Sequence, residues 1–431
     1  MILQMRMLVT TTDSFFIFIG DGMTTKTGVS LILASMLTAL HLICIELSFG
    51  QTTAVPFLLI SSSPESNGQG TASVSRQTDD PFVVNFNPAH LGGMQNNFSV
   101  SFYPTKTNWL PGLGLKDLTY NSYVFCGKTN LKEYVSVPLS IGIAYSRVDL
   151  NLGTFNRTSA AGPDVIGIFN GEEHNDAMSL GVGWDIGIKL AMGITFRRIV
   201  SNLEGGVNAS AWSRDYGLLM NVPIAELITK KPELIAGIAP LFDFSFGTAL
   251  TNMDGTISYF DKAQADPLPR NISIGTSIVL GLNLIKIDSK IITFSWSRQA
   301  DNILVGRNQD GSSYYRGIFG DLSFGKNIIQ GKWTDAVKIS QGWQIGLGEF
   351  IYIRQGSYQG GGFNYIKTDG LGISTSGLFK FLSLGAEGNT FINQLSDHFD
   401  LHYDQSNYDT NELDSPSNST KFSSLSLFIK F

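Results

Sequence analysis

Residues 180–196 read LGVGWDIGIKLAMGITF. Every even position carries a large apolar side chain, whereas the odd positions carry glycine, aspartate, lysine, alanine or threonine. A period of two residues is typical of a β-strand, because successive side chains of a strand point to opposite faces. A strand needs only about 10 residues to cross a bilayer. The segment therefore predicts two strands with a turn near residues 185–187.

One apolar face and one small, polar face fit two architectures: a soluble sandwich, or a transmembrane barrel that turns the apolar face toward lipid. Composition favours the barrel, because charged residues are 15% of the chain, against about 25% in soluble proteins. The mean hydropathy of +0.07 is too polar for a bundle of membrane helices. The net charge of -6 and the lack of a basic stripe argue against nucleic acid as a partner.

The N-terminal region predicts an export signal. From Met23 the chain has a basic Lys26, an apolar stretch over residues 29–45 and small residues before the expected cut. This pattern is typical of a secretory signal peptide, here over residues 23–50. Residues 1–22 do not fit such a signal and are interpreted as a mis-called extension. A retained N-terminal helix is the alternative.

The cysteines give no disulfide in this interpretation. Cys44 lies in the signal peptide, and the bulky Ile43 before it argues against a lipoprotein cleavage site. Cleavage leaves Cys126 as the single cysteine, so we expect no intramolecular disulfide in the mature chain.

Alternation recurs through the rest of the chain and is separated by turn-rich pieces such as NMDGT and QGSYQGGG. The alternating segments are residues 98–102, 137–146, 242–247, 272–284, 292–298, 341–354, 362–367 and 424–431. No linker interrupts the series, so residues 97–431 predict one all-β fold, an antiparallel transmembrane β-barrel. At roughly 20 to 25 residues per strand and connection, this length gives about 14 strands, an even number as in bacterial barrels.

The C-terminus carries the most specific local pattern. SSLSLFIKF ends the chain on an aromatic residue, with Leu427, Ile429 and Phe431 in alternation. This ending resembles the closing-strand signal of outer-membrane proteins, which implies the barrel assembly machinery as a partner. Together with the signal peptide it predicts the outer membrane of a Gram-negative bacterium, with outer-membrane lipid around the barrel.

Residues 51–96 alternate poorly and are interpreted as an N-terminal hatch segment. DDPFVV at residues 79–84 predicts a helix start, with an Asp cap and Pro81 in the first turn.

The residues that follow carry a family resemblance. The run Asn87, Pro88, Ala89 and Leu91 resembles the hatch motif of the FadL-like barrels, the superfamily of long-chain fatty-acid transporters. His90 departs from the small residue that is usual there. The resemblance implies a barrel whose lumen is closed by an N-terminal plug.

Longer stretches resemble the PorV/PorQ branch of that superfamily. They are residues 192–220, with Asp215, Tyr216 and Gly217 at the return strand, residues 251–277, and residues 342–361, where Ser357 intrudes before Tyr358. The resemblance implies a role in protein export or surface attachment with the type IX secretion machinery, by binding exported proteins. The alternative that the superfamily implies is a transport channel for hydrophobic compounds across the outer membrane, with hydrophobic small molecules as partners.

Enzyme chemistry is not expected. The sequence contains no GxSxG, HExxH or GxxxxGK[ST] pattern, so we predict no catalytic residue and no cofactor.

The sharpest cluster of possible metal ligands is SDHFDLHYDQSNYDTNELD, residues 396–414. Its weak candidates are His398, His402 and Asp404, because imidazoles four apart on a helix can share a metal and carboxylates on a loop can hold calcium. The favoured interpretation is a solvated acidic loop. An even-stranded barrel that begins and ends in the periplasm runs its last strand inward, so we predict residues 394–421 on the cell surface.

Arg197 and Arg198 are interpreted as lumen or rim charges, and the tryptophans as interfacial girdles rather than stacking platforms for a ligand. The tryptophans are Trp109, Trp184, Trp212, Trp296, Trp333 and Trp343.

Overall fold

The computed structural model describes residues 53–131, 137–159, 162, 164–204, 207–229, 237–308, 310, 312–385, 394–395, 397–409 and 419–430. They belong to one compact unit, which begins at Thr53. The predicted signal peptide, the predicted extension before it and Phe431 lie outside the described residues.

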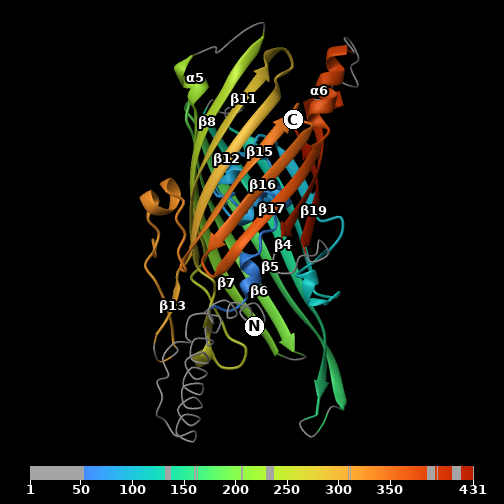
Figure 1. The fold of residues 1–431 in the computed structure, drawn as a ribbon, viewed down its shortest axis with the longest axis vertical. Coiled ribbons are helices and arrows are strands. Elements are labelled where there is room, and N and C mark those ends of the chain that lie inside the picture. Colours follow the sequence, from blue (N-terminus) through green and yellow to red (C-terminus); the bar gives the residue numbers. More distant parts are fainter. Residues whose placement is uncertain are drawn as a thin grey trace, which may run out of the picture. The chain divides into compact units, whose positions relative to one another are not determined.

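Long antiparallel strands form a barrel wall (Figure 1). They are β1 (Phe98–Phe102), β3 (Thr119–Asn130), β4 (Leu139–Thr158), β5 (Val165–Asp185), β6 (Lys189–Glu204), β7 (Val207–Pro223), β8 (Ile238–Met253), β11 (Asn271–Leu284), β12 (Ser289–Ile303), β15 (Val337–Leu347), β16 (Ile351–Gly360), β17 (Phe363–Ser374), β18 (Phe399–Asp409) and β19 (Thr420–Ile429). Strand β1 closes the ring, because Val100 pairs with Phe125 of β3 and with Leu427 of β19. The prediction of an antiparallel barrel of 14 strands is confirmed.

Shorter elements lie in the connections and in the hatch. The strands are β2 (Thr107–Asn108), β9 (Thr256–Ile257), β10 (Asp266–Pro267), β13 (Val305–Arg307) and β14 (Ser313–Tyr315). The helices are η1 (Pro56–Leu59), α2 (Pro64–Asn67), η2 (Pro81–Asn85), α3 (His90–Gly93), η3 (Pro111–Leu113), α5 (Ile224–Ile228), η4 (Lys262–Gln264), η5 (Ile285–Ile287), η6 (Phe324–Ile329) and α6 (Ser376–Gly385). Among the described helices, none has the length and the apolar character that a membrane span requires.

The turn expected within residues 180–196 is confirmed. Strand β5 ends at Asp185 and β6 begins at Lys189. Gly187 adopts a φ of 93° between them, a conformation that glycine reaches without steric cost. The amide of Gly187 donates to Oδ1 of Asp185 at 3.3 Å. Trp184 then lies opposite Leu190 in the hairpin.

Two segments differ from their sequence-based interpretation. Residues 341–354 form parts of two strands, because Gly348 turns the chain with a φ of 61°. The acidic stretch is not one loop, since β18 occupies residues 399–409 and pairs with β17 and β19. Charged residues in β18 are compatible with a strand because they point into a polar lumen.

The connections distinguish the two ends of the barrel. At the end where β1 starts and β19 finishes, here called the inner rim, several turns are as short as residues 186–188 and 348–350, while α5 and α6 also lie there (Figure 1). At the other end, the outer rim, the connections include residues 103–118, 254–270 and 304–336. Outer-membrane barrels have short periplasmic turns and longer extracellular loops, so we expect the outer rim to face the outside of the cell.

An apolar belt covers the outer wall. Its exposed side chains include Ile143, Leu180, Met192, Leu218 and Leu280, with exposed fractions between 45% and 54%. Lipid makes such a surface favourable, whereas contiguous exposed apolar area is rare on soluble monomers. A closed barrel that satisfies its backbone internally and carries this belt is an outer-membrane protein of a Gram-negative bacterium, as predicted.

Candidate functional site

The hatch, residues 53–96 in the described chain, fills the lumen. Helix α3 contacts β4, β5 and β6 on one side, and α2 contacts β17, β18 and β19 on the other. Most hatch residues from Ser61 to Leu91 are buried. The hatch therefore touches both sides of the barrel, and any passage through the lumen depends on it.

Lumen-facing glycines receive the hatch, and we call them the glycine seat. They are Gly142, Gly181, Gly183, Gly193, Gly217, Gly247, Gly275, Gly342, Gly356 and Gly370. A Cβ atom on Gly193 would stand 2.7 Å from the amide nitrogen of Ala89. One on Gly342 would stand 2.7 Å from Cα of Gln69, on the far side of the barrel. The hatch backbone thus lies in van der Waals contact with the wall, and a larger residue has no space at these positions.

The hatch motif lies on this seat. Asn87 donates from Nδ2 to the carbonyl oxygens of Val74 at 2.8 Å and Leu218 at 3.1 Å. Its Oδ1 accepts from the amide of Ala89 at 3.0 Å. One side chain thus joins two parts of the hatch to strand β7, which gives a physical reason for asparagine at this position.

The other motif residues fill the remaining space. Pro88 and Ala89 lie against Gly193, and Leu91 lies against Gly142 and Gly181. Leu91 is fully buried. Gly181 and Gly193 of the segment at residues 180–196 are therefore contact points for the hatch motif.

A buried ion pair fixes the hatch near β6 and β7. Arg197 points into the lumen and donates from Nε to Oδ2 of Asp215 at 2.6 Å. Its Nη2 donates to the carbonyl oxygen of Asn85 at 2.7 Å. The amide of Asn252 donates to the second oxygen of Asp215 at 2.8 Å. Arg197 is thus a lumen charge as expected, and it holds the hatch backbone.

A second charged group lies on the opposite side. Arg354 donates to Oδ1 of Asp404 at 2.6 Å and from Nε to Gln344 at 2.6 Å. Within the hatch, Nη2 of Arg76 lies 3.1 Å from a carboxylate oxygen of Glu65. These charges are almost fully buried, so each depends on its partner for compensation.

Asp80 links two turns of the hatch. Its carboxylate caps η2 by accepting from the amide of Phe82 at 3.0 Å, and it accepts from the hydroxyl of Ser63. The predicted cap and the position of Pro81 agree with this, although the helix is a 3₁₀ turn. Burial raises the pKa of Asp80 to about 7, and the nearby Glu65 raises it as well.

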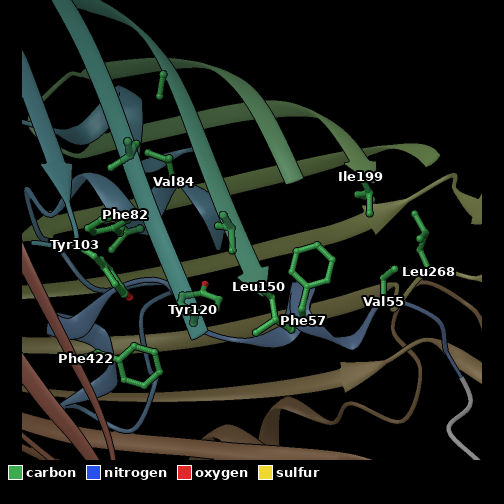
Figure 2. Packing of buried hydrophobic residues seen from close by; sticks show 14 of the residues in the cluster. Val55, Phe57, Phe82, Val84, Tyr103, Tyr120, Leu150, Ile199, Leu268 and Phe422 are labelled. Carbon is green, nitrogen blue, oxygen red and sulfur yellow. The ribbon is translucent and has the colours of Figure 1, made fainter. Parts of the chain in front are cut away.

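Toward the outer rim, buried hydrophobic side chains of the hatch and the wall pack together (Figure 2). We call the residues there the lumenal apolar cluster: Val55, Phe57 and Phe82 of the hatch, with Tyr103, Tyr120, Val148, Leu150, Ile199, Ile257, Leu268, Tyr408 and Phe422. Ring centroids of Tyr120 and Phe422 are 6.0 Å apart, and those of Tyr408 and Phe422 are 5.1 Å apart. Hatch and wall therefore share one hydrophobic core inside the barrel.

The weak metal candidates have different partners and do not form one site. Asp404 pairs with Arg354, while Nε2 of His402 lies 2.7 Å from Oδ2 of Asp400. His398 lies at the inner rim, where Nδ1 is 2.9 Å from the carbonyl oxygen of Lys430. The described residues contain no group of three or more His, Cys, Asp or Glu side chains placed to hold a metal.

The predicted assembly signal lies in β19. Leu427 pairs with Leu401 of β18 and Val100 of β1, and its side chain is on the lipid face. Ile429 pairs with Phe98 and Phe399 in the same way. The two described residues of the signal thus lie on the strand that closes the barrel.

Sequence reasoning missed the partners of these groups. Arg354 and Asp404 form a hydrogen bond although they are 50 residues apart in the chain. Gln299 was also missed, and its Oε1 accepts from the amides of Ser73 and Val74 at 2.9 and 2.8 Å. The available signal was a polar residue at a lumen-facing position of an alternating strand.

No protein-family model matches the sequence, and no curated protein matches it. The chain is similar in structure to the toluene transporter TbuX of Ralstonia pickettii, with a TM-score of 0.39, 11% identity, and coverage of 87% of this chain and 100% of that one. It is also similar to a FadL homologue of Pseudomonas aeruginosa, with a TM-score of 0.39, 8% identity, and coverage of 86% and 99%. A third similar structure is the CymD monoaromatic hydrocarbon channel, with a TM-score of 0.39, 11% identity, and coverage of 85% and 97%.

Proposed function

We propose that the barrel is a channel for hydrophobic compounds across the outer membrane. The observation that carries the proposal is the lumenal apolar cluster. Lumens that conduct water-soluble solutes are polar and filled with water, whereas here Tyr120, Leu150, Ile199 and Phe422 face inward from four different strands. An apolar molecule would lose no favourable hydration on entering such a lumen, whereas a sugar or an ion would.

The hatch itself occupies this part of the lumen. Phe57 and Val55 pack into the cluster, and the amide of Ala54 donates to the carbonyl oxygen of Pro267 at 3.0 Å. A compound that enters from outside therefore has to replace these hatch side chains. Because hydrophobic contacts are not directional, an apolar ligand can substitute for Phe57 without loss of specific bonds.

Uptake by cells whose outer membrane excludes apolar compounds tests the proposal. Radiolabelled oleate and toluene should enter faster when the protein is present, and sucrose should not. Phe57→Ala should change the rate of apolar uptake several-fold, because it loosens the hatch in the lumen. Phe294→Ala, on the lipid face of β12, is the matched control and should behave as the wild type. Faster sucrose entry with unchanged oleate and toluene entry would overturn the proposal.

Protein export remains the second candidate, and the β4–β5 hairpin favours it. The part of β4 that follows Asn151 and the part of β5 that precedes Glu172 pair only with each other. This two-stranded part projects from the outer rim. Ile166 and Ile168 on this projecting part are 62% and 69% exposed. A two-stranded ribbon with exposed apolar side chains is suited to strand addition by a partner protein.

A photo-crosslinker at Ile168 in intact cells separates the two candidates. Capture of an exported protein would support a role in type IX secretion. The matched control is Ile186, which is 68% exposed at the inner rim. Equal capture at both positions, or none at Ile168 in a cell that exports type IX cargo, would remove the export hypothesis and leave the channel.

A further inference from the structure

The connection between β12 and β15 folds back over the outside of the barrel. We call residues 316–336 of it, which include η6, the hook. In Figure 1 the segment that follows β13 runs beside the wall. Helix η6 contacts both β11 and β12. The hook is therefore packed against the wall rather than extended into solvent.

The alternation of the wall strands shows which face the hook covers. Gln299 of β12 and Ser340 of β15 point inward, because they bond to Ser73 and Thr71 of the hatch. Their neighbours Ala300 and Ile339 therefore point outward, yet they are only 1% and 5% exposed. These outward-facing residues are buried because the hook lies on the outer face.

Hook and wall share a second apolar cluster on that outer face. Ile328 of the hook packs with Ala300, Val337 and Ile339 of the wall. Leu322 of the hook packs against the same group. Since the fully buried members come from both sides, this contact is a packed core rather than a loose approach.

Arg298 of β12 fastens the hook. It points outward, where a charge facing lipid is costly. Its Nη1 donates to the carbonyl oxygens of Ile328 at 2.9 Å and Ile329 at 3.0 Å. Its Nη2 donates to Oε1 of Gln341 at 3.2 Å, and its guanidinium lies 4.9 Å from the ring centroid of Trp296. The hook thus supplies the acceptors that let an arginine lie on this face.

Asn302 of β12 bonds to two further residues of the hook. Its Nδ2 donates to the carbonyl oxygen of Ala336 at 2.6 Å, and its Oδ1 accepts from the amide of Asp321 at 2.9 Å. Farther along, Phe324 lies against Phe246 of β8, with ring centroids 6.2 Å apart. Phe246 belongs to the apolar belt, because the adjacent Gly247 faces the hatch. The hook therefore reaches the level of the belt.

The hook exposes several large apolar side chains. Its exposed apolar residues are Ile318 (55%), Phe319 (69%), Phe324 (48%), Ile329 (68%) and Trp333 (47%). Lys326 and Lys332 are exposed on the same segment, as are Asp321 and Asp335. Apolar side chains with interspersed lysines are typical of segments that lie in the interface of a membrane and contact anionic head groups.

We propose that the hook is a lipid-binding element that lies in the outer leaflet, with acyl chains on Phe319 and Ile329 and anionic head groups at Lys326 and Lys332. The occupant is lipid, because the exposed face of the hook continues the apolar belt through the contact of Phe324 with Phe246. Arg298 holds this element at its depth. The inference stands on the outer wall alone and does not depend on what passes through the lumen.

Fluorescence quenching in vesicles tests the depth of the hook. Phe319→Cys or Ile329→Cys is labelled with bimane and reconstituted in phosphatidylcholine–phosphatidylglycerol vesicles whose acyl chains carry bromine. We expect strong quenching by the bromolipid and weak quenching by aqueous iodide. Ser312→Cys, exposed beside β14 at the outer rim, is the matched control and should show the reverse. Iodide quenching at Phe319→Cys and Ile329→Cys equal to that at Ser312→Cys would overturn the proposal, and would indicate that a water-soluble partner covers this face.

Two further variants test the attachment and the head-group contact. Arg298→Gln in the labelled Phe319→Cys protein should lower bromolipid quenching at least twofold, while Arg214→Gln, an exposed arginine on β7 paired with Asp254, should not. Replacing both Lys326 and Lys332 by Gln should remove the preference for phosphatidylglycerol over pure phosphatidylcholine in the quenching signal. If the barrel remains folded and none of these substitutions alters the quenching by the bromolipid, the assigned contacts are refuted.

Discussion

Asn87 of the hatch lies directly on Gly217 of strand β7. A Cβ atom added to Gly217 would stand 2.9 Å from Cδ of Pro88 and closer still to Oδ1 of Asn87. Such overpacking costs roughly 1–3 kcal/mol, which changes an equilibrium about 5- to 150-fold. We therefore expect Gly217→Ala to shift the hatch out of its seat, and single-channel conductance in a planar bilayer should show more frequent opening.

The control for this change is Gly127→Ala. A Cβ atom on Gly127 would meet its nearest neighbour, Cγ2 of Ile143, at 3.9 Å, an ordinary contact. Its conductance should match the wild type. If both variants open equally often, the hatch is not held by close contact with the wall.

Removal of the charge at Arg354 should loosen the hatch from the other side. Arg354→Gln leaves Asp404 buried without its partner, and breaking a buried pair in this way costs about 3–5 kcal/mol. The temperature at which the folded band disappears on a gel should fall. Arg214→Gln breaks an exposed pair with Asp254, for which about 0–1 kcal/mol is expected, and an equal effect of the two changes would contradict the role of burial.

Asp80 predicts a pH dependence of seating. In the seated hatch, burial first and then Glu65 raise its pKa to about 7, against the ordinary value of 3.8. The seated state therefore holds a proton that the released state loses, so seating is strongest below about pH 4 and weakens as the pH rises through about 7. Channel opening should increase over this window.

Asp80→Asn tests that assignment, because an amide oxygen can still accept from Phe82 but cannot titrate. The opening of this variant should be flat over the same pH range. Glu65, Arg76 and Asp404 also act on Asp80 or on its partners. An unchanged pH profile in Asp80→Asn would assign the dependence to those groups instead.

Orientation is tested by epitopes at the two rims. Strand β18 ends at Asp409 and β19 begins at Thr420, both at the outer rim, whereas residues 186–188 join β5 to β6 at the inner rim. An epitope inserted near Ser415 should bind antibody on intact cells, and one inserted at Gly187 should bind only after the outer membrane is opened. The reverse pattern would mean that the barrel is inserted the other way round.

The sequence predicted the wall better than its contents. Alternation over residues 180–196 is a local pattern, so it predicts strands and a turn without knowledge of the fold. The alternation does not explain why the face with small side chains contains Gly181, Gly183 and Gly193. The reason is the backbone of the hatch, about a hundred residues earlier in the chain, and only the folded structure brings the two together.

Strand β18 was missed for a related reason. Its residues alternate, with Leu401 and Tyr403 exposed and His402 and Asp404 turned inward. The acidic residues made a solvated loop the favoured interpretation, because a buried carboxylate needs a partner. That partner is Arg354 on β16, and the sequence alone does not place it there.

The glycine seat also extends around much of the circumference of the barrel. Its members lie on β4, β5, β6, β7, β8, β11, β15, β16 and β17, so a single continuous segment at the N-terminus touches most of the wall at defined positions. A chain that lacked one strand hairpin would bring the wrong positions against the hatch. The completed ring therefore has to match the dimensions of a segment that precedes every wall strand in the chain.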